Sequence, residues 1–133
     1  MAAIFARELV KQGKVVLMVA MTNAATDHLA IVTKGLGVDV VRHYSSHIPE
    51  SSRDPTLSTS ATVDLKNATC IVTTAVACGS AAFKGLVFDY AFVDEVSLNN
   101  IHSIENKDSL LCGLVNHHTC VSFRAASWWS HSL

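Results

Sequence analysis

The sequence predicts an α/β domain with a mostly parallel sheet and flanking helices. Short apolar runs rich in β-branched residues are separated by a helical pattern, and the order strand, helix, strand is typical of a parallel sheet. Half of the 133 residues are hydrophobic and only 16% are charged, as expected when strands are buried on both faces. At this length the chain is expected to form one compact domain.

The first half of the chain supplies a helix, a strand, a second helix and a second strand. Residues 2–12 are rich in helix formers, and residues 15–20 form a continuous apolar run too short for a helix, which predicts a central strand. Thr22 and Asn23 are residues that cap helices, and they precede a helical pattern over residues 24–34 that two glycines end. A short strand is expected at residues 38–41.

The second half supplies two more strands after a long gap. Residues 43–62 hold two prolines and many serines with little periodicity, which predicts a long surface loop or a partly disordered insertion. Strands are expected at residues 70–74 and 90–93, separated by a segment of small residues. Beyond residue 98 the pattern indicates no convincing element, except a helix around residues 109–116 as one alternative.

Composition excludes several classes of protein. Ten basic and eleven acidic residues give a net charge of −1, so any contact with nucleic acid must be local. The first dozen residues carry charges that interrupt a secretory signal, so an intracellular protein with reduced thiols is expected. The uncharged residues 67–83 contain too many polar residues, and too few residues in all, for a transmembrane helix of about 20 apolar residues.

Two adjacent carboxylates, Asp94 and Glu95, directly follow the apolar strand that ends at Val93. Ligands of parallel sheets bind at the carboxyl ends of the strands, so this pair is expected where a nucleotide would lie. An aspartate there can hold Mg²⁺, and a glutamate can orient and deprotonate the water that attacks a phosphate. The alternative is a solvated turn after an edge strand.

Three segments of the chain carry a recognisable pattern when they are read together. They are residues 15–29, which read VVLMVAMTNAATDHL, residues 70–74, which read CIVTT, and residues 90–97, which read YAFVDEVS. In this order they resemble superfamily-one nucleic-acid helicases of the nonsense-mediated-decay type. The first segment is similar to motif Ia, the strand, loop and helix close to VLVCAPSNxAVDxL, the second to a later strand with a terminal threonine pair, and the third to motif II. The resemblance covers roughly residues 2–98.

This resemblance implies a P-loop NTPase (RecA-like) fold, ATP and Mg²⁺ as cofactors, and single-stranded RNA or DNA as a partner. It implies that Asp94 is the Mg²⁺ ligand and Glu95 the general base. It also implies that Thr22, Asn23 and Thr74 contact the sugar-phosphate backbone without regard to base sequence. Residues 1–98 would be a partial first helicase ATPase domain, and residues 99–133 a divergent, unstructured tail.

The chain departs from the family in several places. Met21 and Val96 replace the usual proline and alanine. No G-x-x-x-x-G-K-[ST] loop is present, and Gly13-Lys14 stands in another context. The family continues after motif II with a further strand and a G-D-x-x-Q-L-P-P segment, which the tail lacks. We therefore expect a fragment that does not hydrolyse ATP by itself, with a tail of unrelated coding sequence from about Ile101. The alternative is a non-catalytic α/β interaction or RNA-binding module derived from a helicase.

Three other kinds of site are weaker hypotheses. A zinc site would use four residues of the tail, but their spacing fits no common zinc finger; they are Cys112, His117, His118 and Cys120. Cys70 or Cys78 could act as a nucleophile, although a thiol inside an apolar strand usually behaves as a small hydrophobe. Trp128 and Trp129 could stack on bases, or they are simply exposed aromatic residues.

Overall fold

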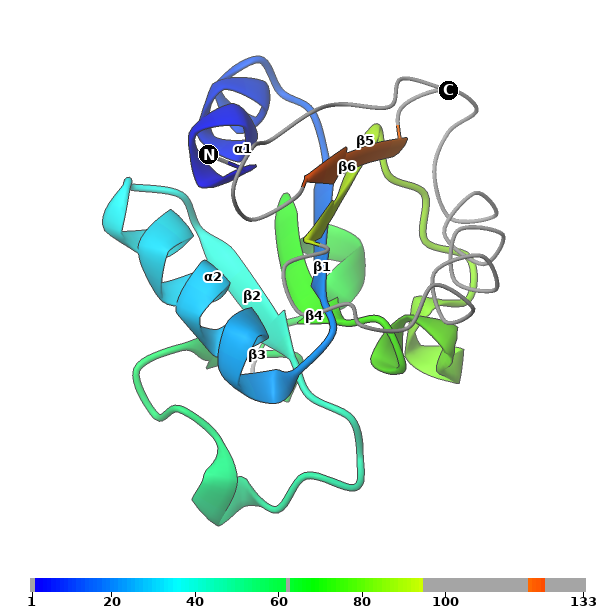
Figure 1. Cartoon of the computed structure of the whole chain (residues 1–133). Helices are drawn as coiled ribbons and strands as arrows, with labels where there is room; N and C mark the ends of the chain where they lie inside the picture. The colour runs from blue at the N-terminus through cyan, green and yellow to red at the C-terminus, as the bar shows by residue number, and fades with distance from the viewer. Residues whose placement is uncertain (1, 62, 95–119, 124–133) are drawn as a thin grey trace.

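The centre of the molecule is a six-stranded sheet with the strand order β3-β2-β4-β1-β5-β6 (Figure 1). The computed structural model describes residues 2–61, 63–94 and 120–123. Every strand pair is parallel, which confirms the predicted fold class. The strands are β1 Val16–Ala20, β2 Val40–His43, β3 Ser58–Thr59, β4 Cys70–Thr74, β5 Tyr90–Asp94 and β6 Cys120–Phe123.

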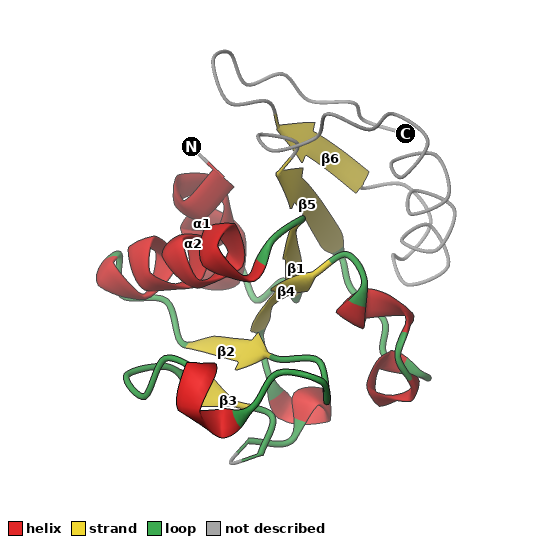
Figure 2. Ribbon diagram, turned by 60° about the horizontal axis from the view of Figure 1, so that its bottom comes forward, coloured by secondary structure: helices red, strands yellow, loops and turns green. Residues whose placement is uncertain are grey.

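Two α-helices lie on one face of this sheet, α1 Ala2–Lys11 and α2 Asn23–Gly35 (Figure 2). Short 3₁₀ helices contribute to the opposite layer: η2 Leu65–Asn67, η3 Ala77–Gly79 and η4 Ala81–Phe83. A further 3₁₀ helix, η1 Glu50–Ser52, lies in the loop between β2 and β3. The sheet is therefore the middle layer of three.

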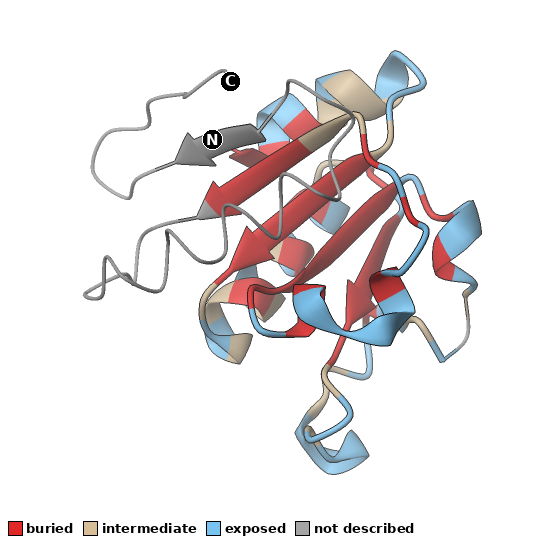
Figure 3. Cartoon of the chain, turned by 90° about the vertical axis from the view of Figure 1, so that its right-hand side faces the viewer, coloured by how far each residue is buried: buried red, intermediate tan, exposed pale blue. Residues whose placement is uncertain are grey.

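Strand β1 shows why its run of apolar residues is continuous. All five of its residues are buried (Figure 3). Val16 and Met18 belong to the core beneath the α-helices, whereas Leu17 and Val19 belong to the core on the other face. Because successive side chains of a strand point to opposite faces, both faces of β1 contact an apolar layer, which favours an apolar residue at every position.

Residues 43–61 contain more regular structure than the predicted surface loop. Strand β2 runs to His43, two residues beyond the predicted end, and Tyr44 and Leu57 are both buried. Ser58–Thr59 then forms β3, which pairs with β2. The full length of β2 was not predicted, because Arg42 and His43 are polar residues that are buried through contacts with distant side chains.

Strand β6 is an element that we did not predict. Cys120–Phe123 pairs in parallel with β5, and Asp94 is in register with Phe123. The tail was expected to lack the further strand that follows motif II in the family, but β6 lies beside the strand that carries motif II. The alternative helix around residues 109–116 lies outside the described residues.

The amino ends of β1 and β5 are linked by hydrogen bonds between Val15 and the chain at Asp89. The backbone N–H of Val15 donates to Oδ2 of Asp89 at 2.8 Å, and the N–H of Asp89 donates to the carbonyl of Val15 at 2.9 Å. This link joins residues that are 74 positions apart. Within the part of the chain that the structure describes, neither α-helix is long and apolar enough to cross a bilayer.

Candidate nucleic-acid interface

Three neighbouring strands end at one edge of the sheet. Ala20, the last residue of β1, is in register with Thr74, the last residue of β4. On the other side of β1, Val19 is in register with Val93, so β5 reaches the same edge and ends at Asp94. The structure therefore brings Thr74, the loop after β1 and the backbone of Asp94 to the carboxyl edge, where ligands of parallel sheets bind.

The loop after β1 leads directly into helix α2. Thr22 is the N-cap residue, with extended backbone angles, and its Oγ1 accepts a hydrogen bond from the N–H of Ala25 at 3.1 Å. The carbonyl of Thr22 accepts from Oγ1 of Thr26 at 2.6 Å. The first turn carries no acidic residue, so the positive end of the helix dipole is presented at this edge, and such helix ends attract anions.

Thr74 lies at the same edge but is 7% exposed. Its Oγ1 accepts a hydrogen bond from the N–H of Ala77 at 3.2 Å, which fixes the turn into η3. The N–H of Ala75 donates to the carbonyl of Ala20 at 3.0 Å and extends the β4–β1 ladder past the strand end. A hydroxyl that accepts one hydrogen bond still has its own proton to donate, so Thr74 can offer one donor.

A buried polar network lies behind Asn23. Arg42 is 0% exposed, and its Nε donates to Oδ1 of Asp27 at 2.8 Å. Its Nη2 donates to Oδ1 of Asn23 at 3.0 Å, and its Nη1 donates to the carbonyl of His43. The guanidinium carbon lies 3.9 Å from the ring centroid of Tyr44, whose hydroxyl also donates to Oδ1 of Asp27 at 2.8 Å. The network thus holds the start of α2 against the end of β2.

This network was not predicted from the sequence, although two signals were present. Arg42 is a basic residue inside an otherwise apolar strand, and such a residue requires a buried partner. Asn23 and Asp27 are four residues apart on a helix, so they face the same side. Those two positions together could have identified the partner.

His43 continues the carboxyl edge beyond β4, since it is in register with Thr73. Its Nδ1 lies 2.9 Å from Oγ of Ser60, and its ring meets that of Phe83 edge-on at 5.0 Å. Burial lowers the pKa of His43 below its ordinary value, and the charges of two nearby arginines lower it further. The ring is therefore neutral at physiological pH, and its contacts with Ser60 and Phe83 hold it at the carboxyl edge.

Of the carboxylate pair, the structure places only the backbone of Asp94. Asp94 is the last residue of β5, and Glu95 lies outside the described residues. Three of the four tail residues of the zinc hypothesis also lie outside them, as do both tryptophans, and the fourth, Cys120, begins β6. Among residues 2–61, 63–94 and 120–123, no three potential metal ligands gather in one place.

The thiol of Cys70 lies deep in the core. It is 0% exposed and contacts Sδ of Met18 at 3.8 Å. Burial, aided by the negative charge of Asp39, raises its pKa to about 12. A thiol that stays protonated is a poor nucleophile, so Cys70 has the properties of a core hydrophobe.

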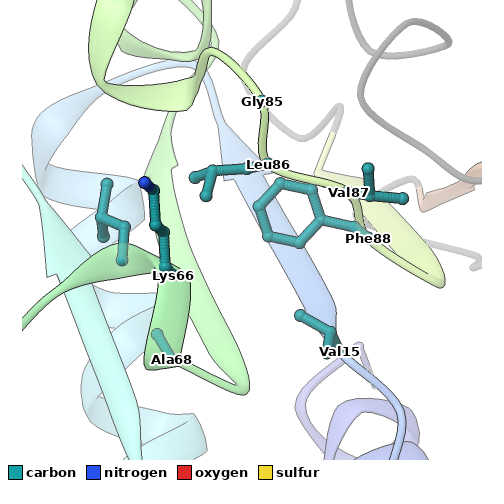
Figure 4. Close-up of a pocket in the computed structure, with 8 residues that line it drawn as sticks. Val15, Lys66, Ala68, Gly85, Leu86, Val87 and Phe88 are labelled. Carbon is teal, nitrogen blue, oxygen red and sulfur yellow. The ribbon is translucent and has the colours of Figure 1, made fainter.

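A cavity of about 170 Å³ lies at the opposite, amino edge of the strands (Figure 4). The lining residues are Val15, Leu65, Lys66, Ala68, Gly85, Leu86, Val87 and Phe88. Among them, Lys66 is the one residue with a polar side chain.

No family model and no curated protein matches the chain. Among solved structures, the chain is similar to a crystal structure described as the C-terminal part of the Fun30 ATPase domain, with a TM-score of 0.53 and 13% sequence identity. The match covers 90% of this chain and 38% of that chain. At this identity the likeness shows a shared fold, and that fold belongs to part of an ATPase domain.

Proposed function

We propose that the chain is a piece of the first ATPase domain of a nucleic-acid helicase, related to the nonsense-mediated-decay type. The observation that carries the proposal is the carboxyl edge: Thr74, the pair Thr22 and Asn23, and Asp94 follow three adjacent parallel strands. The likeness to the C-terminal part of an ATPase domain supports the coarser part of this proposal, a fold derived from a helicase ATPase domain. The complete motor would couple ATP hydrolysis to movement on single-stranded RNA or DNA.

The nucleic-acid contacts in this proposal come from neutral donors. The hydroxyls of Thr22 and Thr74 and the amide of Asn23 would donate hydrogen bonds to phosphate oxygens, which fix position without reading sequence. The free N–H groups in the first turn of α2 add to the same site. Because these groups release no counterions, the affinity should be modest and only weakly dependent on salt.

The carboxyl edge has a suitable ligand for Mg²⁺ but no loop to hold the triphosphate of ATP. The carboxylate of Asp94 is the kind of ligand that Mg²⁺ prefers, and when bound the ion would neutralise negative charge on the phosphates. Glu95 would orient and deprotonate the attacking water. The 133 residues contain no glycine-rich loop with a lysine to hold the triphosphate. Hydrolysis is therefore proposed for a longer protein, and this chain alone is expected to be inactive.

The first test is a titration of the chain against fluorescent single-stranded U12 and dT12, followed by anisotropy. We expect a Kd of roughly 10⁻⁴ M that weakens by less than about tenfold between 50 and 200 mM salt. A double-stranded competitor should displace the probe poorly. If neither single strand binds, the proposed interface is wrong.

The second test concerns the motor. Single-turnover hydrolysis of Mg-ATP is measured for this chain and for the same chain joined to the flanking coding sequence of its gene. Hydrolysis by the longer protein alone, abolished by Glu95→Gln, is the expected result. If the longer protein binds RNA without hydrolysing ATP, the alternative of a non-catalytic module derived from a helicase is correct.

A further inference from the structure

Asn23 is the residue of the proposed interface whose side chain contacts the buried Arg42. We propose that Arg42 is a positioning residue, which turns the amide of Asn23 so that it offers only N–H donors to the carboxyl edge. The site would then select hydrogen-bond acceptors, namely the phosphate oxygens of a single-stranded nucleic acid. This inference rests on the proposed function and specifies the role of one of its residues.

The orientation of the amide follows from the chemistry of the guanidinium. Arginine has five N–H donors and no acceptor. Its Nη2 lies 3.0 Å from Oδ1 of Asn23, and only the amide oxygen can accept that hydrogen bond. The two ends of an amide are distinguished by such partners. With Oδ1 committed to Arg42, the Nδ2 group faces the other way, and no described residue accepts a hydrogen bond from it.

Arg42 is held firmly enough to act in this way. Its side chain is fully buried, and three contacts besides Asn23 fix the guanidinium. They are Oδ1 of Asp27 at 2.8 Å, the carbonyl of His43, and the ring of Tyr44 at 3.9 Å. A rotation of Asn23 that broke its contact would leave a buried donor unpaired, which is unfavourable.

The network also determines which ligand the edge prefers. The carboxylate of Asp27 neutralises Arg42, so the arginine itself is not a phosphate ligand. What remains at the edge is the Nδ2 group of Asn23 together with the positive end of the α2 dipole. Both favour an anionic acceptor.

The substitution Asn23→Asp separates this role from a structural one. A carboxylate has the same shape and accepts from Arg42 equally well, so the fold is retained. It has no donor and adds a negative charge, so we expect the affinity for fluorescent U12 to fall at least fivefold while the thermal midpoint stays within about 2 °C or rises. Asn23→Ala, which removes the donor without adding charge, should have a smaller effect on affinity.

Asn67→Asp is the matched control, because Asn67 is exposed in η2, which precedes β4 and lies toward the opposite edge. It adds the same charge and should leave the affinity for U12 unchanged. A second measurement needs no variant: in the unaltered chain, the side-chain NH₂ signals of Asn23 in a ¹H–¹⁵N spectrum should shift when U12 is added. Arg42→Lys, which cannot hold the amide in the same way, should weaken binding several-fold.

The outcomes are distinct. If the unaltered chain does not bind U12, the proposed function and this inference are both overturned. If it binds U12, and Asn23→Asp binds as tightly while the NH₂ signals of Asn23 do not move, only the inference is overturned. Weaker binding by Asn23→Asp but not by Asn67→Asp, with the fold retained, supports it.

Discussion

Removal of the carboxylate of Asp27 should destabilise the domain strongly. Asp27→Ala deletes the acceptor of two hydrogen bonds, one from Nε of Arg42 and one from the hydroxyl of Tyr44, each 2.8 Å long. The guanidinium of Arg42, fully buried, would then lack a counter-charge. An uncompensated buried charge is among the most unfavourable features that a substitution can create.

The size of the effect follows from the burial of the two partners. Breaking a buried ion pair by removing one partner costs about 3–5 kcal/mol. The side chain of Asp27 is 24% exposed, so water can partly replace it, and the lower limit of about 3 kcal/mol is expected. For a domain of this size about 1 kcal/mol shifts the thermal midpoint by roughly 4 °C, so the midpoint should fall by about 12 °C.

Urea unfolding followed by circular dichroism measures the change. Glu8→Ala is the control, because Glu8 also lies in a helix but its ion pairs are on the surface, and it should change the free energy of unfolding by less than about 0.5 kcal/mol. The double variant Asp27→Ala with Arg42→Met removes the buried charge and should recover at least half of the loss. Equal stability of Asp27→Ala and Glu8→Ala, or no recovery in the double variant, would refute the reasoning.

Three further predictions concern single side chains. Thr22→Ala removes the cap on the N–H of Ala25 and should lower the free energy of unfolding by about 1 kcal/mol, whereas Thr22→Ser should not; urea unfolding measures both. Burial lowers the pKa of His43 in the folded protein, so the unfolded chain binds a proton more readily, and the free energy of unfolding falls as the pH drops below about 6.5. The urea midpoints at pH 7.5 and pH 5.5 should therefore differ less in His43→Gln than in the unaltered chain. An unchanged difference would contradict this. Cys70 should resist iodoacetamide in the folded protein and react in 8 M urea, as peptide mass mapping would show; labelling without urea would contradict its burial.

The strands that could be predicted are those whose residue pattern reflects their burial in the sheet. Residues 15–20 are apolar throughout because β1 lies between two cores, and this was visible in the sequence. The strands at residues 70–74 and 90–93 were found in the same way. The parallel order alone predicted that Asp94 lies at the carboxyl edge of the sheet, whereas Thr22 and Thr74 were identified through the resemblance to helicase motifs.

What could not be predicted depends on contacts between distant residues. From the sequence alone Arg42 would be assigned to the surface, because its burial depends on an ion pair with Asp27, 15 positions earlier. Strand β3 has only two residues and exists because β2 offers an edge to pair with. Strand β6 pairs with a partner that ends 26 positions before it begins. The local periodicity of hydrophobic residues does not identify such distant partners.

The position of β1 has a consequence for the order of folding. Val16 faces Cys70 on one side and Tyr90 on the other, 54 and 74 positions further along the chain. Strand β1 therefore leaves the ribosome well before either of its two neighbours. Long loops must close before it is paired, which slows folding. Until then its apolar residues are exposed to other chains and to chaperones.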